Sequence, residues 1–123
     1  SDYSRIFNKA QINMITGYTI SSNADDIDTA TVHAYITQSY WAKGIPFLTM
    51  EKAINNSICF SVFDSKNKQV GFARMITDKA TFAYLADVYI LHEHRGKGLS
   101  KYLMKTILQH PELQGLRRMT LAT

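Results

Sequence analysis

The sequence is poor in cysteine and proline: its 123 residues include one cysteine and two prolines. Because Cys59 has no second thiol to pair with, an internal disulfide is excluded, and a lone reduced thiol fits a cytoplasmic protein. No apolar run approaches the roughly 18 residues of a membrane span. Charged side chains also interrupt the N-terminal apolar residues, so the sequence predicts neither a membrane anchor nor a signal peptide.

Repeats, low-complexity tracts and Gly/Ser-rich linkers are absent as well. Hydrophobic residues make up 46% and charged residues 20% of the chain, which is ordinary globular usage and excludes a largely disordered protein. A chain of this length can bury one hydrophobic core but is too short for two domains. We therefore expect a single domain over residues 1–123.

The positive excess is small, with 14 Lys and Arg against 10 Asp and Glu. A net charge of +4 suits an anionic ligand and a nucleic acid equally well, so the total does not choose between them. The positions of the cations are more informative, because the last third of the chain holds Arg95, Lys97, Lys101, Lys105, Arg117 and Arg118.

The hydrophobic pattern predicts an α/β protein, of the α+β kind with a mixed sheet. Strands are expected over residues 14–21, 58–63, 69–76, 81–91 and 118–122. Helices are expected from a cap cluster at 23–26 to about residue 39, from a cap at Thr49 to 55 or 56, and over 98–110. Residues 40–46 form a predicted loop, and residues 1–12 a loose arm or a short helix. The order is β-α-α-β-β-β-α-β, and its last crossover implies a parallel pair of strands.

The most informative segment is the one where the apolar strand 81–91 runs into a basic, glycine-containing loop and then a helix. Free backbone N–H groups in the first turn of a helix, together with the helix dipole, attract anions. Glycines let a phosphate approach the backbone, and Arg95, Lys97 and Lys101 add full charges. The segment therefore predicts an anion-binding cradle. The alternative is that Gly96 and Gly98 only permit a turn.

The same residues resemble the acyl-CoA signature of the GNAT superfamily of N-acetyltransferases, Q/R-x-x-G-x-G/A. Arg95 takes its first position and Gly98 its fourth, while Ser100 stands where glycine or alanine is usual. The preceding residues, Asp87 to Ile90, are similar to the fourth strand of that fold. The order of predicted elements agrees along nearly the whole chain, although about fifteen residues carry the likeness specifically.

The resemblance implies a GNAT-like acyl-CoA N-acyltransferase fold that uses acetyl-CoA as a cosubstrate, without a metal. It implies that the backbone of Val88, Tyr89 and Ile90 binds the pantetheine arm. It assigns the pyrophosphate to the loop and first helical turn, formed by Arg95, Gly96, Lys97, Gly98, Leu99, Ser100 and Lys101. The acceptor would be a primary amine of a small molecule or peptide, attacking the thioester directly.

The resemblance also implies a missing part. The family continues after its fifth strand with a further helix and two strands, and that segment often supplies a tyrosine that protonates the leaving thiolate. This sequence ends at Thr123, so we expect a fold that is incomplete at its C-terminal side, with no assignable tyrosine of that kind. An exposed strand edge there would favour pairing with a second copy of the chain.

Two side chains of the strand 81–91 are candidates for proton transfer. Burial in an apolar strand would suit the Asp87 carboxylate to act as a base; alternatively, it hydrogen-bonds neighbouring backbone at a bulge. Tyr84 lies near a position where some relatives carry a basic carboxylate; alternatively, it packs in the core. Strict alternation places the two on opposite faces unless a bulge intervenes.

Other candidates are less specific. Tyr40 and Trp41 lie in the loop that commonly shapes the acceptor site of the family; alternatively, they form a hydrophobic staple between helices. His92 and His94 could bind a metal, but no third ligand is evident, and a solvated loop is the simpler interpretation. Cys59 lacks an obvious base and is not expected to be a nucleophile.

Three functions therefore remain open. The first is an acetyl-CoA-dependent N-acetyltransferase, which accounts for the cradle, the cations and the element order. The second is a GNAT relative that binds CoA without catalysis. The third is a basic nucleic-acid-binding module, which we consider the weakest. That module needs aromatic residues interleaved with cations on one surface, whereas most aromatics here fall in apolar strands.

Overall fold

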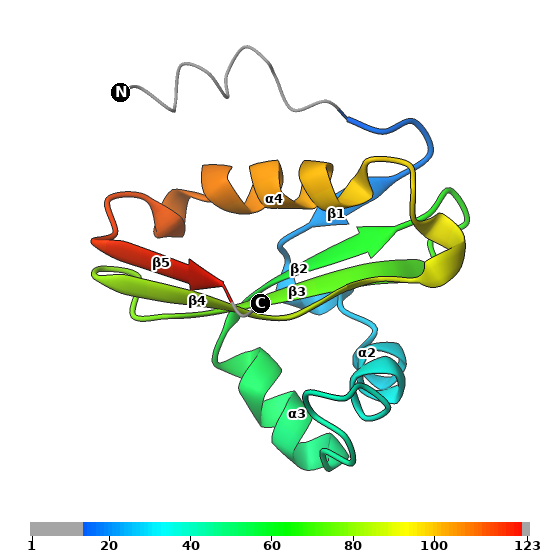
Figure 1. Ribbon diagram of the computed structural model, residues 1–123, viewed down its shortest axis with the longest axis horizontal. Coiled ribbons are helices and arrows are strands. Elements are labelled where there is room, and N and C mark those ends of the chain that lie inside the picture. The colour runs from blue at the N-terminus through cyan, green and yellow to red at the C-terminus, as the bar shows by residue number, and fades with distance from the viewer. Residues whose placement is uncertain (1–13, 122–123) are drawn as a thin grey trace.

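A computed structural model of the chain, which describes residues 14–121, contains a central sheet with helices on both faces (Figure 1). The strands are β1 (Thr19–Ser21), β2 (Ile58–Phe63), β3 (Gln69–Thr77), β4 (Phe82–Ile90) and β5 (Arg118–Leu121). The α-helices are α2 (Thr29–Ile36), α3 (Phe47–Asn55) and α4 (Leu99–Gln109). Short 3-10 turns are η1 (Ala24–Asp26), η2 (His92–His94) and η3 (Pro111–Leu113). Within this range, no helix has the length and apolar character needed to cross a membrane.

The five strands form one sheet in the order β1-β2-β3-β4-β5. The first three pairings are antiparallel, and β4 and β5 are parallel. The predicted order β-α-α-β-β-β-α-β and the parallel last pair are therefore confirmed, as is the mixed α/β class.

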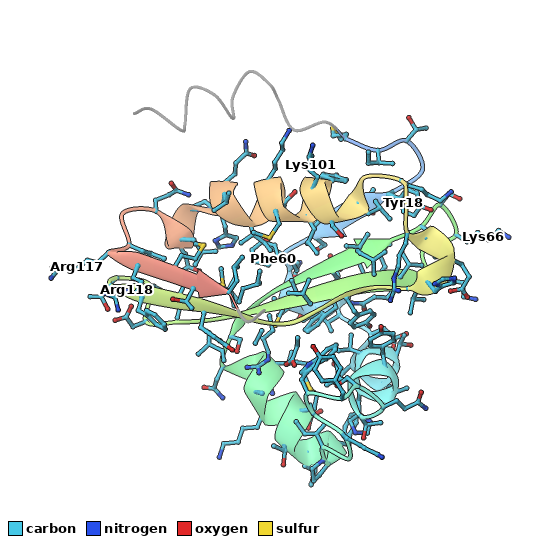
Figure 2. The ribbon with its side chains drawn as sticks, viewed as in Figure 1. Tyr18, Phe60, Lys66, Lys101, Arg117 and Arg118 are labelled. Carbon is cyan, nitrogen blue, oxygen red and sulfur yellow. The ribbon has the colours of Figure 1, made fainter. Side chains whose placement is uncertain are left out.

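The sheet is buried on both faces. On one face, α4 packs over β2, β3 and β4, and Phe60 lies fully buried between the helix and the sheet (Figure 2). On the other face, α2 and α3 place Val32, Ile36 and Met50 against Phe72 of β3 and Tyr89 of β4. Because the apolar positions of each strand alternate between these two layers, most residues of β2 and β3 are buried.

The N-terminal predictions need correction. The strand expected over 14–21 is formed only by Thr19–Ser21, because residues 16–17 make a turn closed by the hydrogen bond from Tyr18 N to Ile15 O. The expected cap cluster forms η1, and the helix begins after it, with the Asp28 carboxylate accepting from Thr31 N. That helix ends at Ile36 rather than near residue 39.

The cap predicted at Thr49 is wrong, because α3 begins at Phe47 and Thr49 lies inside it. Pro46 starts this helix: its fixed φ and missing N–H suit the position that precedes the first turn. The predicted helix 98–110 is α4, with Gly98 as its N-cap and His110 as its C-cap. The arm at residues 1–12 and the strand end at Ala122 lie outside the described residues.

Gly71 allows β3 to pack closely against both neighbouring strands. A Cβ added there would lie 2.8 Å from Ile90 Cδ1, 3.1 Å from Tyr89 O and 3.1 Å from Val62 Cβ. The first contact could relax by side-chain rotation, but the second is to the backbone of β4 and cannot.

We expect Gly71→Ala to lower the free energy of unfolding by about 1–3 kcal/mol, because overpacking a tight core forces backbone shifts. Denaturant unfolding checks this. The matched control is Ser65→Ala in the exposed β2–β3 turn, which should stay within about 0.5 kcal/mol of the parent. Equal stability of both variants would contradict this expectation and would show that the backbone of β4 shifts at this point without a measurable cost.

Candidate active site

A bulge in β4 is the central irregularity of the sheet. Phe72 pairs with Tyr89 and Arg74 pairs with Ala86, so β4 uses one residue more than β3 over this stretch. Asp87 lies in the extra segment with a φ of 52°, in the left-handed region. Aspartate is one of the few non-glycine residues that adopts this conformation readily, which explains how the strand tolerates it.

The bulge changes which side chains share a face. Without it, Tyr84 and Asp87 would point to opposite sides of the sheet. With it, both residues line one cavity on the face covered by α2 and α3. The bulge therefore brings the two predicted proton-transfer candidates to the same cavity.

This cavity has a volume of about 460 Å³, within the range of small-molecule sites. The sheet supplies its floor and the loop between α2 and α3 supplies its wall. Its lining comprises Tyr40, Trp41, Ala42, Ile45, Arg74, Ile76, Tyr84, Leu85, Ala86, Asp87 and Val88. All four residues predicted for catalysis or acceptor binding are thus present at one site.

Asp87 is held by two side chains. Its Oδ2 accepts a hydrogen bond from Arg74 Nε at 2.7 Å, and its Oδ1 accepts from Trp41 Nε1 at 2.8 Å. The carboxylate side chain is only 7% exposed and that of Arg74 15%, so this ion pair is largely shielded from water. The expected alternative, a bond from Asp87 to neighbouring backbone, is not found among the described residues.

Sequence reasoning missed Arg74. The available signal was an arginine inside the apolar strand 69–76, opposite an aspartate inside the apolar strand 81–91. Two opposite charges on neighbouring strands predict a buried pair, because an unpaired charge there would be costly. Trp41 was named for its aromatic wall, but its hydrogen bond to Asp87 was not anticipated.

Tyr40 and Trp41 contact each other edge to face, with ring centroids 5.2 Å apart. Tyr40 is 88% exposed and Trp41 is 42% exposed. The staple that would bury both between the helices is therefore not formed. Instead the two rings stand at the cavity, where they can contact a bound molecule.

The edge of β4 facing β5 is partly open. The parallel register runs from Phe82↔Arg118 to Leu85↔Leu121, and within residues 14–121 no strand pairs with that edge after Leu85. Val88 is exposed, whereas the Tyr89 ring is buried and stacks on Tyr35 of α2 with centroids 3.8 Å apart. Burial raises the pKa of the Tyr89 phenol. Tyr89 can therefore offer only its backbone to a ligand at the open edge.

The predicted anion cradle lies at the start of α4. Gly98 is the N-cap with a φ of 87°, Gly96 has a φ of 79°, and no side chain caps the helix. The N–H groups of the first turn of any helix lack an intrahelical partner, and here no side chain of the N-cap residue replaces it. Leu99 is buried in the core, whereas Lys97 and Lys101 are exposed, as Figure 2 shows for Lys101. The local structure fits a phosphate group bound by backbone and cations.

Arg95 lies at the junction of the cradle and β4. Its Nε donates to Ile90 O at 2.8 Å, and a terminal nitrogen reaches Tyr35 Oη at 3.4 Å. The guanidinium thus ties the cradle to the end of β4 and to α2. Both contacts fix the loop relative to the end of β4, and the first uses the Ile90 carbonyl as its acceptor.

The remaining candidates are not part of the site. His94 contacts Tyr18 Oη through Nδ1 at 2.7 Å, and no group of three metal-ligating side chains occurs within residues 14–121. Burial raises the pKa of the Cys59 thiol to about 12, so it is not an activated nucleophile. Arg117 and Arg118 lie at the opposite end of the molecule from Lys66 (Figure 2).

Comparison with known proteins identifies the family. Residues 21–123 match the acetyltransferase (GNAT) family. The chain belongs to this family. A Gibberella zeae protein assigned as an acetyltransferase is 31% identical over an alignment of 128 positions, which spans 86% of this chain and 71% of that protein. An uncharacterized N-acetyltransferase of Gracilaria tenuistipitata is 34% identical over 80 residues, covering 62% of this chain and 44% of that protein.

Solved structures agree with this assignment. A GNAT-family protein of Xanthomonas campestris pv. campestris, assigned as an acetyltransferase, is 46% identical with a TM-score of 0.85, covering 89% of this chain and 78% of its own. Glucosamine-6-phosphate N-acetyltransferase of Arabidopsis thaliana has a TM-score of 0.64 at 12% identity, over 86% and 82% of the two chains, a likeness of fold alone. The GNAT resemblance predicted from sequence is confirmed, and the protein is an acetyltransferase.

We expect Asp87→Asn to lower the free energy of unfolding by about 1–3 kcal/mol, because the partly buried Arg74 loses its counter-charge. Asparagine keeps the left-handed backbone accessible, so the loss reports the ion pair rather than the bulge. Thermal and denaturant unfolding measure it. Glu112→Gln breaks the exposed pair with Lys79 and should change stability by less than about 1 kcal/mol. Similar losses in both variants would contradict this interpretation.

Proposed function

We propose that this GNAT acetyltransferase transfers the acetyl group of acetyl-CoA to a primary amine of a small molecule or peptide, by direct attack of the amine. The observation that carries the proposal is the bulge at Asp87. It forms the floor of the acceptor cavity, and the strand that follows it leads within a few residues to the anion cradle. An acceptor and an anionic cosubstrate would thereby meet at one point of β4.

Acetyl-CoA fits the open edge and the cradle. Its pyrophosphate would bind the backbone N–H groups from Gly96 to Lys101, with Lys97 and Lys101 adding charge. Its pantetheine arm would lie along the backbone of Val88 and Tyr89. When bound, it supplies an acetyl group activated as a thioester. Arg95 contributes indirectly, because its bonds to Ile90 O and Tyr35 fix the loop.

Asp87 and Tyr84 would act on the acceptor. The Asp87 carboxylate, which Arg74 holds in place, can accept a hydrogen bond from the amine and orient its lone pair. Tyr84 lines the same cavity, and its hydroxyl can relay to water the proton that the amine loses. Trp41 holds Asp87 in place while its ring, with Tyr40, contacts the body of the acceptor.

The first experiment is a thermal-melt series with acetyl-CoA, CoA and ATP, followed by a CoA-release assay with a panel of amines. A ligand at ten times its dissociation constant stabilises the protein by about 1.4 kcal/mol, which is a readily measured shift of several degrees. Protection by both CoA species without protection by ATP supports the cradle. Amine-dependent CoA release distinguishes an enzyme from a CoA-binding relative, and salt-sensitive affinity for nucleic acid would support the third alternative.

We expect Lys97→Glu to raise the KM or Kd for acetyl-CoA about tenfold, because it reverses a charge beside the phosphate-binding backbone. The acceptor KM should stay unchanged. Arg117→Glu makes the same reversal at an exposed position at the other end of the molecule and serves as the control. Equal effects of the two variants would indicate general charge attraction and would contradict a localised cradle.

We expect Tyr84→Phe to lower kcat about 100-fold without weakening acetyl-CoA binding, because the ring remains and the hydroxyl is lost. Steady-state kinetics across pH measure this effect. Tyr102→Phe removes a phenol from α4, on the opposite face of the sheet, and should retain parental kcat. Full activity of Tyr84→Phe would leave only a packing role for this side chain.

A further inference from the structure

The acceptor cavity has balanced charge. Among its lining residues, Asp87 carries the only carboxylate and Arg74 the only guanidinium, and these two groups pair with each other at 2.7 Å. The rest of the lining is aromatic or aliphatic apart from two phenol groups. A polycationic acceptor would therefore find no uncompensated negative charge to bind it, while losing its own hydration.

Arg74 still has hydrogen-bonding capacity. Its Nε donates to Asp87 and one terminal nitrogen donates to Ser57 Oγ at 3.2 Å. The other terminal nitrogen makes no hydrogen bond to any residue of the range 14–121. It is also not one of the enclosed unpaired polar atoms, which are Ser61 Oγ and Tyr89 Oη. An accessible guanidinium N–H at a cavity is suited to a carboxylate.

The Asp87 carboxylate can accept further hydrogen bonds. Each of its oxygens accepts one hydrogen bond, from Trp41 and Arg74, and a carboxylate can accept about four. The pair therefore presents a remaining acceptor beside a remaining donor. A molecule with an amine and a carboxylate on adjacent atoms would match both, amine toward Asp87 and carboxylate toward Arg74.

We infer that the acceptor is an α-amino acid with an apolar, preferably aromatic, side chain, and that Arg74 determines this specificity by binding its carboxylate. The inference rests on the proposed function and names the acceptor class of the same site. The side chain of the amino acid would lie against Trp41, Tyr40 and Ile76, three exposed apolar groups of the lining. Amines without a carboxylate, amino sugars and polyamines lack the carboxylate, the apolar side chain or both.

The test measures kcat/KM at saturating acetyl-CoA for L-phenylalanine, L-phenylalanine amide, spermidine and glucosamine 6-phosphate, each corrected for its fraction of neutral amine. The amide retains every group except the carboxylate charge. We expect L-phenylalanine to exceed its amide by about tenfold or more, because a site built to pair a charged group rejects an analogue without it. Spermidine and glucosamine 6-phosphate should be poorer than both.

Arg74→Lys separates specificity from folding. Lysine keeps a positive partner for Asp87 but loses the planar donor set, so the preference for phenylalanine over its amide should fall to about twofold or less. The readout is the ratio of the two kcat/KM values, because any effect of the substitution on the position of Asp87 lowers both values alike. Arg118→Lys, an exposed position on β5 outside the cavity, should leave the preference unchanged.

The outcomes are separable. Equal rates for phenylalanine and its amide, or a preference for spermidine or the sugar phosphate, overturn the inference while amine acetylation itself still stands. If no amine is acetylated, protection by N-acetyl-L-phenylalanine in the presence of CoA is decisive, and its absence overturns the inference. Failure of acetyl-CoA to protect the protein instead counts against the proposed function.

Discussion

The ion pair between Arg74 and Asp87 is the interaction on which the site depends. Desolvating two charges inside a sheet is costly, and their mutual attraction offsets that cost only with good geometry and further hydrogen bonds. Here Trp41 and Ser57 supply those bonds. The pair and its two further hydrogen bonds therefore connect β3, β4, the α2–α3 loop and Ser57, which lies between α3 and β2.

The bulge in turn sets the position of the cavity relative to the anion cradle. It adds a residue to β4, which places Tyr84 and Asp87 on the cavity side before the strand continues to Tyr89. Beyond it, the stacking of Tyr89 on Tyr35 and the bond from Arg95 to Ile90 O fix the end of the strand. The cradle is thus positioned relative to the cavity through a ring stack and a hydrogen bond to the backbone of β4.

The sequence predicted what is locally encoded. Alternation of apolar residues located the strands from Ile58 onward, and the basic Gly-x-Gly segment located the cradle at Gly98. The start of α3 was missed because Pro46 initiates it without a polar cap. The ion pair was missed because its partners are separated by 13 residues, and their meeting depends on the hairpin register and on the bulge. Neither the hairpin register nor the bulge is encoded by a local sequence pattern.

Charge balance in the cavity is the feature on which the proposed acceptor specificity rests, in a fold that serves many functions. A fold that presents a lone carboxylate would favour cationic acceptors generally. In the proposed mode of recognition, the pairing of Arg74 with Asp87 makes binding depend on the relative placement of two opposite charges and an apolar body rather than on total charge. If specificity depends on this geometry, a substitution on β3, outside the predicted motif, would change the acceptor without altering the proposed cosubstrate site.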